Sequence, residues 1–114
     1  MNDRRKIAEE FVQAIYCDDI HQTILFGSVA RGDDSKDSDI DILIVIYNDN
    51  PVFESMVDEK VVEFLLEKEE VISAHVMTLK HFNKTKDYSF LQNVMVDGII
   101  IEDKRCEKQN TTHS

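Results

Sequence analysis

The chain has 114 residues, with 13 Lys or Arg and 23 Asp or Glu, so its formal net charge is −10 at pH 7. From this length we expect one domain with a single core and no room for a second catalytic or substrate-binding domain. The acidic balance disfavours duplex nucleic acid as a partner, because affinity for a duplex comes chiefly from Lys and Arg that neutralise phosphates.

Signals for export, membrane insertion or zinc binding are not found in the sequence. The first residues are charged, and no apolar run approaches the roughly 18 residues that a membrane-spanning helix requires. Cys17 and Cys106 lie far apart and lack the CxxC or His spacing of a zinc site. We therefore expect a cytoplasmic protein with reduced thiols and no membrane partner.

The first predicted element is an amphipathic helix that starts at Asn2 or Asp3 and continues to about Asp18. Its apolar residues recur at helical spacing, at Ile7, Ala8, Phe11, Val12 and Ile15. This face is expected to pack against the core. The apolar run over residues 23–26 then predicts the first strand.

A glycine turn follows this strand at Gly27-Ser28. If Ser28 begins a short helix, free backbone N–H groups and the positive end of the helix dipole would face a phosphate beyond the strand. Gly27 lets the backbone approach that phosphate because it has no Cβ, and the Ser28 hydroxyl can donate a hydrogen bond. The turn therefore predicts an anion site.

Arg31, in the polar loop after the turn, has two open interpretations. Its guanidinium fork suits the oxygens of a nucleotide phosphate. It could equally pair with Asp33, Asp34 or Asp37, which are close in sequence. The sequence alone does not separate a nucleotide-binding role from an ion pair within the loop.

The second strand is predicted over Ile40–Ile46, which is nearly continuous hydrophobic sequence and therefore typical of a central strand. Side chains alternate along a strand, so Asp39 and Asp41 share one face. Two neighbouring carboxylates raise each other's pKa unless a cation lies between them. Mg²⁺ binds through one or two carboxylates and completes its shell with water and phosphates, so we predict a magnesium site that holds a nucleoside triphosphate.

The rest of the chain is predicted to alternate between helix and strand. Asn50 as N-cap and Pro51 at the first helical position predict a helix to about Lys68. The later elements expected are a strand over Val71–Leu79, a basic connection over 81–86, a helix capped by Asp87 and a strand over 99–101. Residues 1–102 would form the domain, and 103–114, which lack a core-forming pattern, a disordered tail.

The two central motifs resemble those of the minimal nucleotidyltransferase family, within the superfamily typified by DNA polymerase beta. The resemblance rests on Gly27-Ser28-x-Ala30-Arg31-Gly32 followed by Ser38-Asp39-Ile40-Asp41-Ile42-Leu43. It implies an α/β (α+β) fold, with a mixed, mostly four-stranded twisted sheet and helices packed on one face. It also implies that the Gly-Ser turn binds the triphosphate of ATP and that the two aspartates bind Mg²⁺.

The family's third catalytic carboxylate would be expected near His75, but no Asp or Glu lies between Val71 and Lys86. Such a carboxylate helps to hold the catalytic metal and to activate the attacking hydroxyl. A neutral histidine can accept a proton, although imidazole is a poor Mg²⁺ ligand. Two interpretations stay open: either His75 replaces the carboxylate, or the protein binds a nucleotide and transfers it slowly or never.

The resemblance implies that AMP is transferred from ATP to an acceptor hydroxyl with release of pyrophosphate. Members of the family often act as antitoxins beside a helical HEPN-type protein, so the implied acceptor is a hydroxyl on such a partner. One alternative is a catalytically weak or inactive nucleotide-binding subunit that acts by binding its partner. A less favoured alternative is an enzyme for small, aminoglycoside-like acceptors. Homo-oligomerisation stays open.

Overall fold

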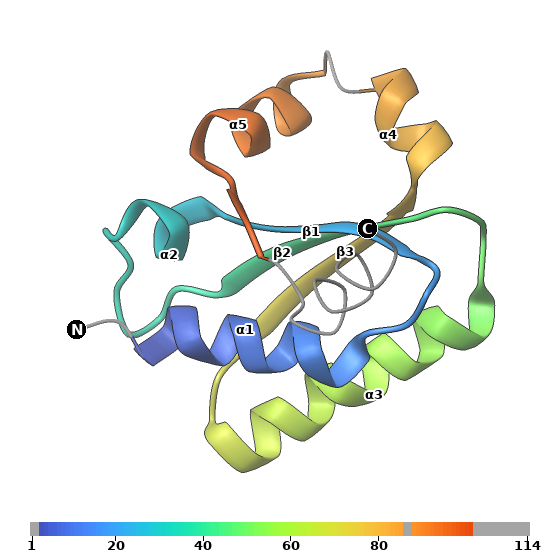
Figure 1. Ribbon diagram of the computed structural model, residues 1–114. Helices are drawn as coiled ribbons and strands as arrows, with labels where there is room; N and C mark the ends of the chain where they lie inside the picture. Colours follow the sequence, from blue (N-terminus) through green and yellow to red (C-terminus); the bar gives the residue numbers. More distant parts are fainter. Residues whose placement is uncertain (1–2, 86–87, 102–114) are drawn as a thin grey trace, which may run out of the picture.

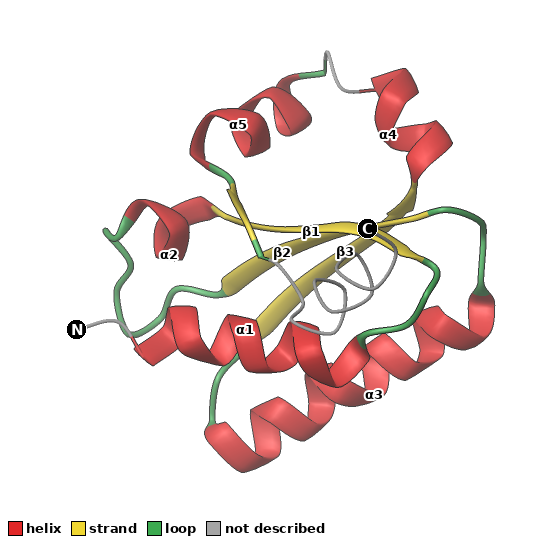
Figure 2. Ribbon diagram, in the orientation of Figure 1, coloured by secondary structure: helices red, strands yellow, loops and turns green. Residues whose placement is uncertain are grey.

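The computed structural model describes residues 3–85 and 88–101, which form a four-stranded sheet with helices on either side (Figure 1). In chain order the elements are α1 (Asp3–Ile15), β1 (Ile20–Phe26), α2 (Gly27–Arg31), β2 (Ile40–Ile46), α3 (Pro51–Lys68), β3 (Ile72–Thr78), α4 (Leu79–Thr85), α5 (Ser89–Asp97) and β4 (Ile99–Ile100). Figure 2 shows the strands as the central layer. Within these ranges no helix combines the length and apolarity that crossing a membrane requires.

The sheet is mixed, with the strand order β3-β2-β1-β4. β1 pairs antiparallel with both β2 and β4, whereas β2 pairs parallel with β3. The parallel pair is joined through α3, because parallel neighbours need a long crossover, usually a helix. β2 is therefore a central strand, as its apolar run predicts, and residues 40 and 42–46 are buried. The predicted fold class is confirmed.

Helices cover both faces of the sheet, which corrects the expectation that they pack on one face. The isoleucines at even positions of β2 belong to a core that includes Phe11 of α1 and Phe53 of α3. On the opposite face, Leu43 packs in a second cluster with Leu91 and Val94 of α5. The odd-numbered side chains of β2 are also apolar beyond Asp41, so they too require a cover from water.

The predicted boundaries of β2 and α3 agree with the structure. Asn50 accepts a hydrogen bond from the Phe53 N–H through Oδ1 at 3.0 Å, and Pro51 occupies the first helical position. β1 begins at Ile20, earlier than predicted, because Ile20 pairs with Ile46. Helix α1 ends at Ile15, earlier than expected, and β3 is shorter by one residue at each end.

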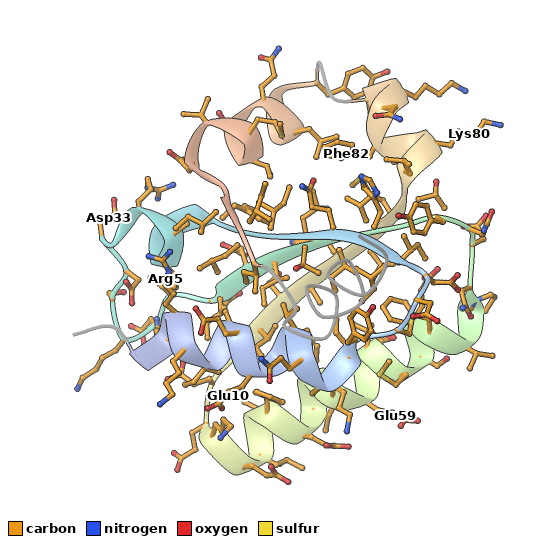
Figure 3. The ribbon with its side chains drawn as sticks, viewed as in Figure 1. Arg5, Glu10, Asp33, Glu59, Lys80 and Phe82 are labelled. Carbon is orange, nitrogen blue, oxygen red and sulfur yellow. The ribbon has the colours of Figure 1, made fainter. Side chains whose placement is uncertain are left out.

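The predicted basic connection over 81–86 is wrong, because helix α4 runs to Thr85. The hydroxyl of Thr78 accepts a hydrogen bond from the His81 N–H at 3.1 Å and so supports the start of the helix. Leu79 and Phe82 are three positions apart and pack against the second apolar cluster; Figure 3 labels Phe82 in the space between α4 and α5. Asp87 and residues 103–114 lie outside the described residues.

Candidate nucleotide and metal site

The Gly-Ser turn forms a direct junction between β1 and the short helix α2. Gly27 has a φ of +78°, in the left-handed region that favours glycine. Gly32 caps the C-terminus of α2, and its N–H donates to the carbonyl oxygens of Ser28 and Val29 at 2.9 and 3.2 Å. The predicted short helix is therefore present, and the buried Val29 side chain fixes it to the core.

Asp41 lies directly beside this turn. In the antiparallel register of β1 and β2, Phe26 pairs with Asp41. A Cβ atom added to Gly27 would overlap with Oδ2 of Asp41 and would lie 3.3 Å from its Cγ. The predicted anion site at the turn and the predicted metal ligand Asp41 therefore lie next to each other. Only a glycine at position 27 leaves room for the Asp41 carboxylate.

The charges of three other predicted site residues affect the pKa of Asp41. Burial of the side chain raises the pKa of Asp41, while the charge of His75 acts in the opposite direction. The charge of Asp39 raises the pKa further and that of Arg31 lowers it. Asp41 is half-buried and Asp39 is exposed. A cation between the two carboxylates would offset both the burial and the repulsion.

Strand β3 adds a serine that the sequence reasoning missed. Asp41 pairs with Ser73 in the parallel register of β2 and β3, and Leu43 pairs with His75. The Ser73 hydroxyl lies 3.3 Å from Nε2 of His75. The His75 ring lies 5.7 Å from the Phe26 ring, measured between centroids. The separation of two residues between Ser73 and His75 is a signal that could have placed both on one face.

Arg31 makes two ion pairs, one with the loop that follows α2 and one with the end of α5. Nε lies 3.2 Å from Oδ2 of Asp33, and Nη1 lies 3.2 Å from Oδ2 of Asp97 at the end of α5. Figure 3 shows Asp33 at the outer end of the α2 turn. Both hydrogen bonds raise the pKa of Arg31, the bond to Asp33 more strongly. The pair with Asp33 was one predicted alternative, whereas Asp97, 66 positions away, was not foreseen.

The donor set suits a magnesium ion that shares its coordination with a nucleotide. Within residues 3–85 and 88–101, no group of three or more His, Cys, Asp or Glu side chains lies close enough together to hold a metal ion. Mg²⁺ does not need such a cage, because it uses one or two carboxylates and takes its other ligands from phosphates and water. Asp39 and Asp41 could supply these carboxylates, and the turn at Gly27 and Ser28, which lies beside Asp41, could bind the phosphates.

Comparison with known proteins points to the same family as the motifs. Residues 4–103 match the family model of the nucleotidyltransferase domain. A Methanocaldococcus jannaschii protein named for an inferred protein adenylyltransferase activity is 41% identical over 104 residues, which cover 89% of this chain and 99% of that protein.

Solved structures share the fold. A Sulfolobus solfataricus protein, classed by inference as a nucleotidyltransferase, is 25% identical with a TM-score of 0.54, covering 86% of this chain and 78% of that one. A variant of the MntA-HpeT toxin-antitoxin is 13% identical with a TM-score of 0.59, covering 93% and 77%. A toxin-antitoxin crystallised with AMP-PNP is 16% identical with a TM-score of 0.58, covering 94% and 78%.

The last two likenesses show the fold alone, because their sequence identities are low. The family assignment rests on the other findings. The family model covers most of the chain, and the archaeal relative is similar over nearly its whole length. The resemblance that the Gly-Ser and Asp-x-Asp motifs imply is confirmed, and the chain belongs to the nucleotidyltransferase domain family.

Proposed function

We propose that the protein is a magnesium-dependent nucleotidyltransferase that transfers AMP from ATP to a hydroxyl group on a helical, HEPN-type partner protein. The observation that carries this proposal is the contact of Asp41 with the Gly27 turn, which joins a metal-binding carboxylate to a backbone bend suited to phosphate. The archaeal relative named for protein adenylyltransferase activity and the toxin-antitoxin neighbours support the acceptor class.

In this mechanism Asp39 and Asp41 would hold Mg²⁺, whose positive charge would offset the negative charge of the triphosphate and of the leaving pyrophosphate. The backbone at Gly27 and Ser28 seats the β and γ phosphates. Arg31 turns from its carboxylate partners toward a phosphate oxygen, as its exposed side chain allows. These residues hold the α-phosphorus in line with an incoming hydroxyl.

The proton of the acceptor hydroxyl must leave as its oxygen forms a bond to the α-phosphorus. The bond from that phosphorus to the pyrophosphate oxygen breaks, and pyrophosphate leaves. His75 is the candidate proton acceptor, because its ring lies on the face of Asp41 and its Nε2 is 3.3 Å from the Ser73 hydroxyl. Its neutral form could take the proton without holding the metal.

A second candidate function is that of a nucleotide-binding subunit that blocks its partner by contact. The observation that favours it is the lack of a third carboxylate, since no Asp or Glu lies between Val71 and Lys86. Two-metal transfer normally uses such a group. In this case the Asp39 and Asp41 pair would hold MgATP as a structural ligand.

Incubation with labelled ATP, Mg²⁺ and a HEPN-type partner separates the two functions. We expect label on the partner and its loss in Asp39→Asn, whereas the exposed loop variant Asp37→Asn retains transfer. A partner that stays unlabelled, yet is still inhibited when Asp39→Asn and Asp41→Asn are combined, would support the binding subunit. Amide shifts on titration with MgATP should centre on Gly27, Ser28 and Asp41; their absence rejects both functions.

A further inference from the structure

We propose that Arg4 is a positioning residue that holds the loop carrying Asp39 in the geometry needed for metal binding, an inference that rests on the proposed function. Arg4 lies in the first turn of α1, and its side chain is only 15% exposed. Its Nη1 donates to the carbonyl oxygen of Ser35 at 2.7 Å, and its Nη2 donates to that of Lys36 at 2.7 Å. One guanidinium therefore binds two consecutive peptide groups.

Arg4 also contacts two carboxylates, one in the loop before β2 and one in the connection before β3. Its Nη1 lies 3.4 Å from Oδ2 of Asp34, in the same loop as Ser35. Its Nε lies 3.1 Å from Oε1 of Glu70, in the connection that leads into β3. Oε1 of Glu70 is shielded from water and has no hydrogen bond of good geometry, so its contact with Arg4 is ionic. Removing Arg4 would leave this buried oxygen without its counter-charge.

The loop segment that Arg4 holds ends directly before Asp39. The Ser38 N–H donates to the Ser35 carbonyl at 3.1 Å, and the Ser35 N–H donates to the Ser38 hydroxyl at 2.9 Å. The Ser35 carbonyl thus accepts from both Arg4 and Ser38. Because Arg4 and Ser38 bind the same residue, Ser35, the contacts of Arg4 also restrain Ser38, which precedes Asp39.

The residue that follows Asp39 is fixed from the other side. The Ile40 N–H donates to the carbonyl oxygen of Val71 at 2.9 Å, and Val71 adjoins Glu70, the ionic partner of Arg4. Asp39 itself is exposed and lies between these two fixed points. Without Arg4, the hydrogen bond of Ile40 would still hold the backbone after Asp39, but the backbone before Asp39 would lose its support. The distance between the carboxylates of Asp39 and Asp41 should therefore vary more.

An arginine is required for these contacts, because only its rigid planar fork can donate to two carbonyls and face two carboxylates at once. Lysine would keep the positive charge but not the fork. Arg4 also lines an open cavity of about 490 Å³, together with Asp34, Ser35, Lys36, Glu69 and Glu70. A small cation from solution can therefore reach the space that an alanine at this position would leave.

Chemical rescue of Arg4→Ala tests this role. We expect the Mg²⁺ concentration for half-maximal MgATP binding to rise by about tenfold or more, as for other residues that orient metal ligands. Amide exchange at Ser35, Ser38 and Ile40 should accelerate. Guanidinium at low millimolar concentration should restore both properties, whereas methylammonium should not. Lys6→Ala removes the same charge from an exposed position of α1 and should change neither.

Each other outcome of this experiment is also decisive. An unchanged Mg²⁺ requirement, or a change that guanidinium does not reverse, overturns the positioning role. If the wild type binds no MgATP, the proposed function fails. The role of Arg4 in holding the loop is then decided by amide exchange alone: faster exchange in Arg4→Ala that guanidinium reverses supports it, and unchanged exchange rejects it. If Arg4→Ala does not fold, Arg4→Lys replaces it: a raised Mg²⁺ requirement with normal thermal stability supports the role, and a normal requirement rejects it.

Discussion

The carboxylate of Asp41 occupies the space where a side chain at residue 27 would begin. Gly27 has no Cβ, and one added there would overlap with Oδ2 of Asp41. The Gly27 turn and strand β2 are thus packed closely against each other at this point, where Phe26 pairs with Asp41 in the strand register.

We predict that Gly27→Ala abolishes MgATP binding and destabilises the fold by more than Gly32→Ala does. Both glycines have left-handed backbones, with φ of +78° and +83°, so alanine costs about 1–2 kcal/mol of backbone strain at either position. Only at Gly27 does the new Cβ also displace Asp41, because nothing lies within 4 Å of the corresponding position at Gly32. Calorimetric binding and thermal unfolding measure both effects.

The double variant Gly27→Ala with Asp41→Ala provides the control for this overlap. If the overlap is the cause, the second substitution recovers the stability lost beyond the backbone strain. Equal destabilisation by Gly27→Ala and Gly32→Ala would contradict the argument.

A second prediction concerns Asp41→Asn, which should raise the melting temperature of the metal-free protein by a few degrees. Burial first, and the charge of Asp39 in addition, raise the pKa of Asp41 above its ordinary value of 3.8. The folded state therefore binds this proton more tightly than the unfolded chain, so stability falls as the pH rises above that ordinary value. The gain from Asp41→Asn should be present at neutral pH and vanish in acid, where Asp41 is protonated.

Magnesium should reverse the order of stability between these proteins. Excess MgATP should raise the melting temperature of the wild type and leave that of Asp41→Asn unchanged, because ligands stabilise only the state that binds them. Asp37→Asn, in an exposed part of the same loop, should behave like the wild type in both conditions. A metal-free Asp41→Asn protein that melts below the wild type would refute the destabilising role of this charge.

The ion pair between Arg31 and Asp97 leads to a third prediction. Asp97→Asn removes one of the two carboxylates that hold Arg31, and we expect MgATP to bind up to about fivefold more tightly, because an exposed ion pair contributes little free energy. Titration calorimetry of the wild type, Asp97→Asn, Arg31→Met and the double variant measures the coupling. A gain that persists in the Arg31→Met background would show that Asp97 acts without Arg31.

The missing carboxylate leads to a fourth prediction: His75→Asp should increase the rate of AMP transfer by about tenfold, because an aspartate can accept the proton in place of the imidazole and also supply a further oxygen ligand on the face of Asp41. Ser73→Asp is the matched comparison, because Ser73 lies opposite Asp41 in the strand register. Transfer at saturating MgATP is the measurement. A loss of transfer in His75→Asp would show that a carboxylate at this position cannot replace the imidazole as proton acceptor.

Local sequence determined the central part of this fold. The hydrophobic run from Ile40 to Ile46 defined a central strand, because a segment apolar at both odd and even positions is stable only when both faces are covered. Asn50 and Pro51 defined the start of α3, since capping depends on residues only a few positions apart. The Gly-Ser turn and the two aspartates were recognisable for the same reason.

Only the tertiary structure decided which distant side chains meet. The pairing of Arg31 with Asp97, the place of Ser73 beside Asp41 and the contacts of Arg4 with Ser35 and Lys36 depend on strand register and helix packing. Helix α4 also required tertiary cover for its two apolar residues. Hydrophobic periodicity specifies which face of an element is buried but not which element covers it, because burial of apolar surface is non-directional.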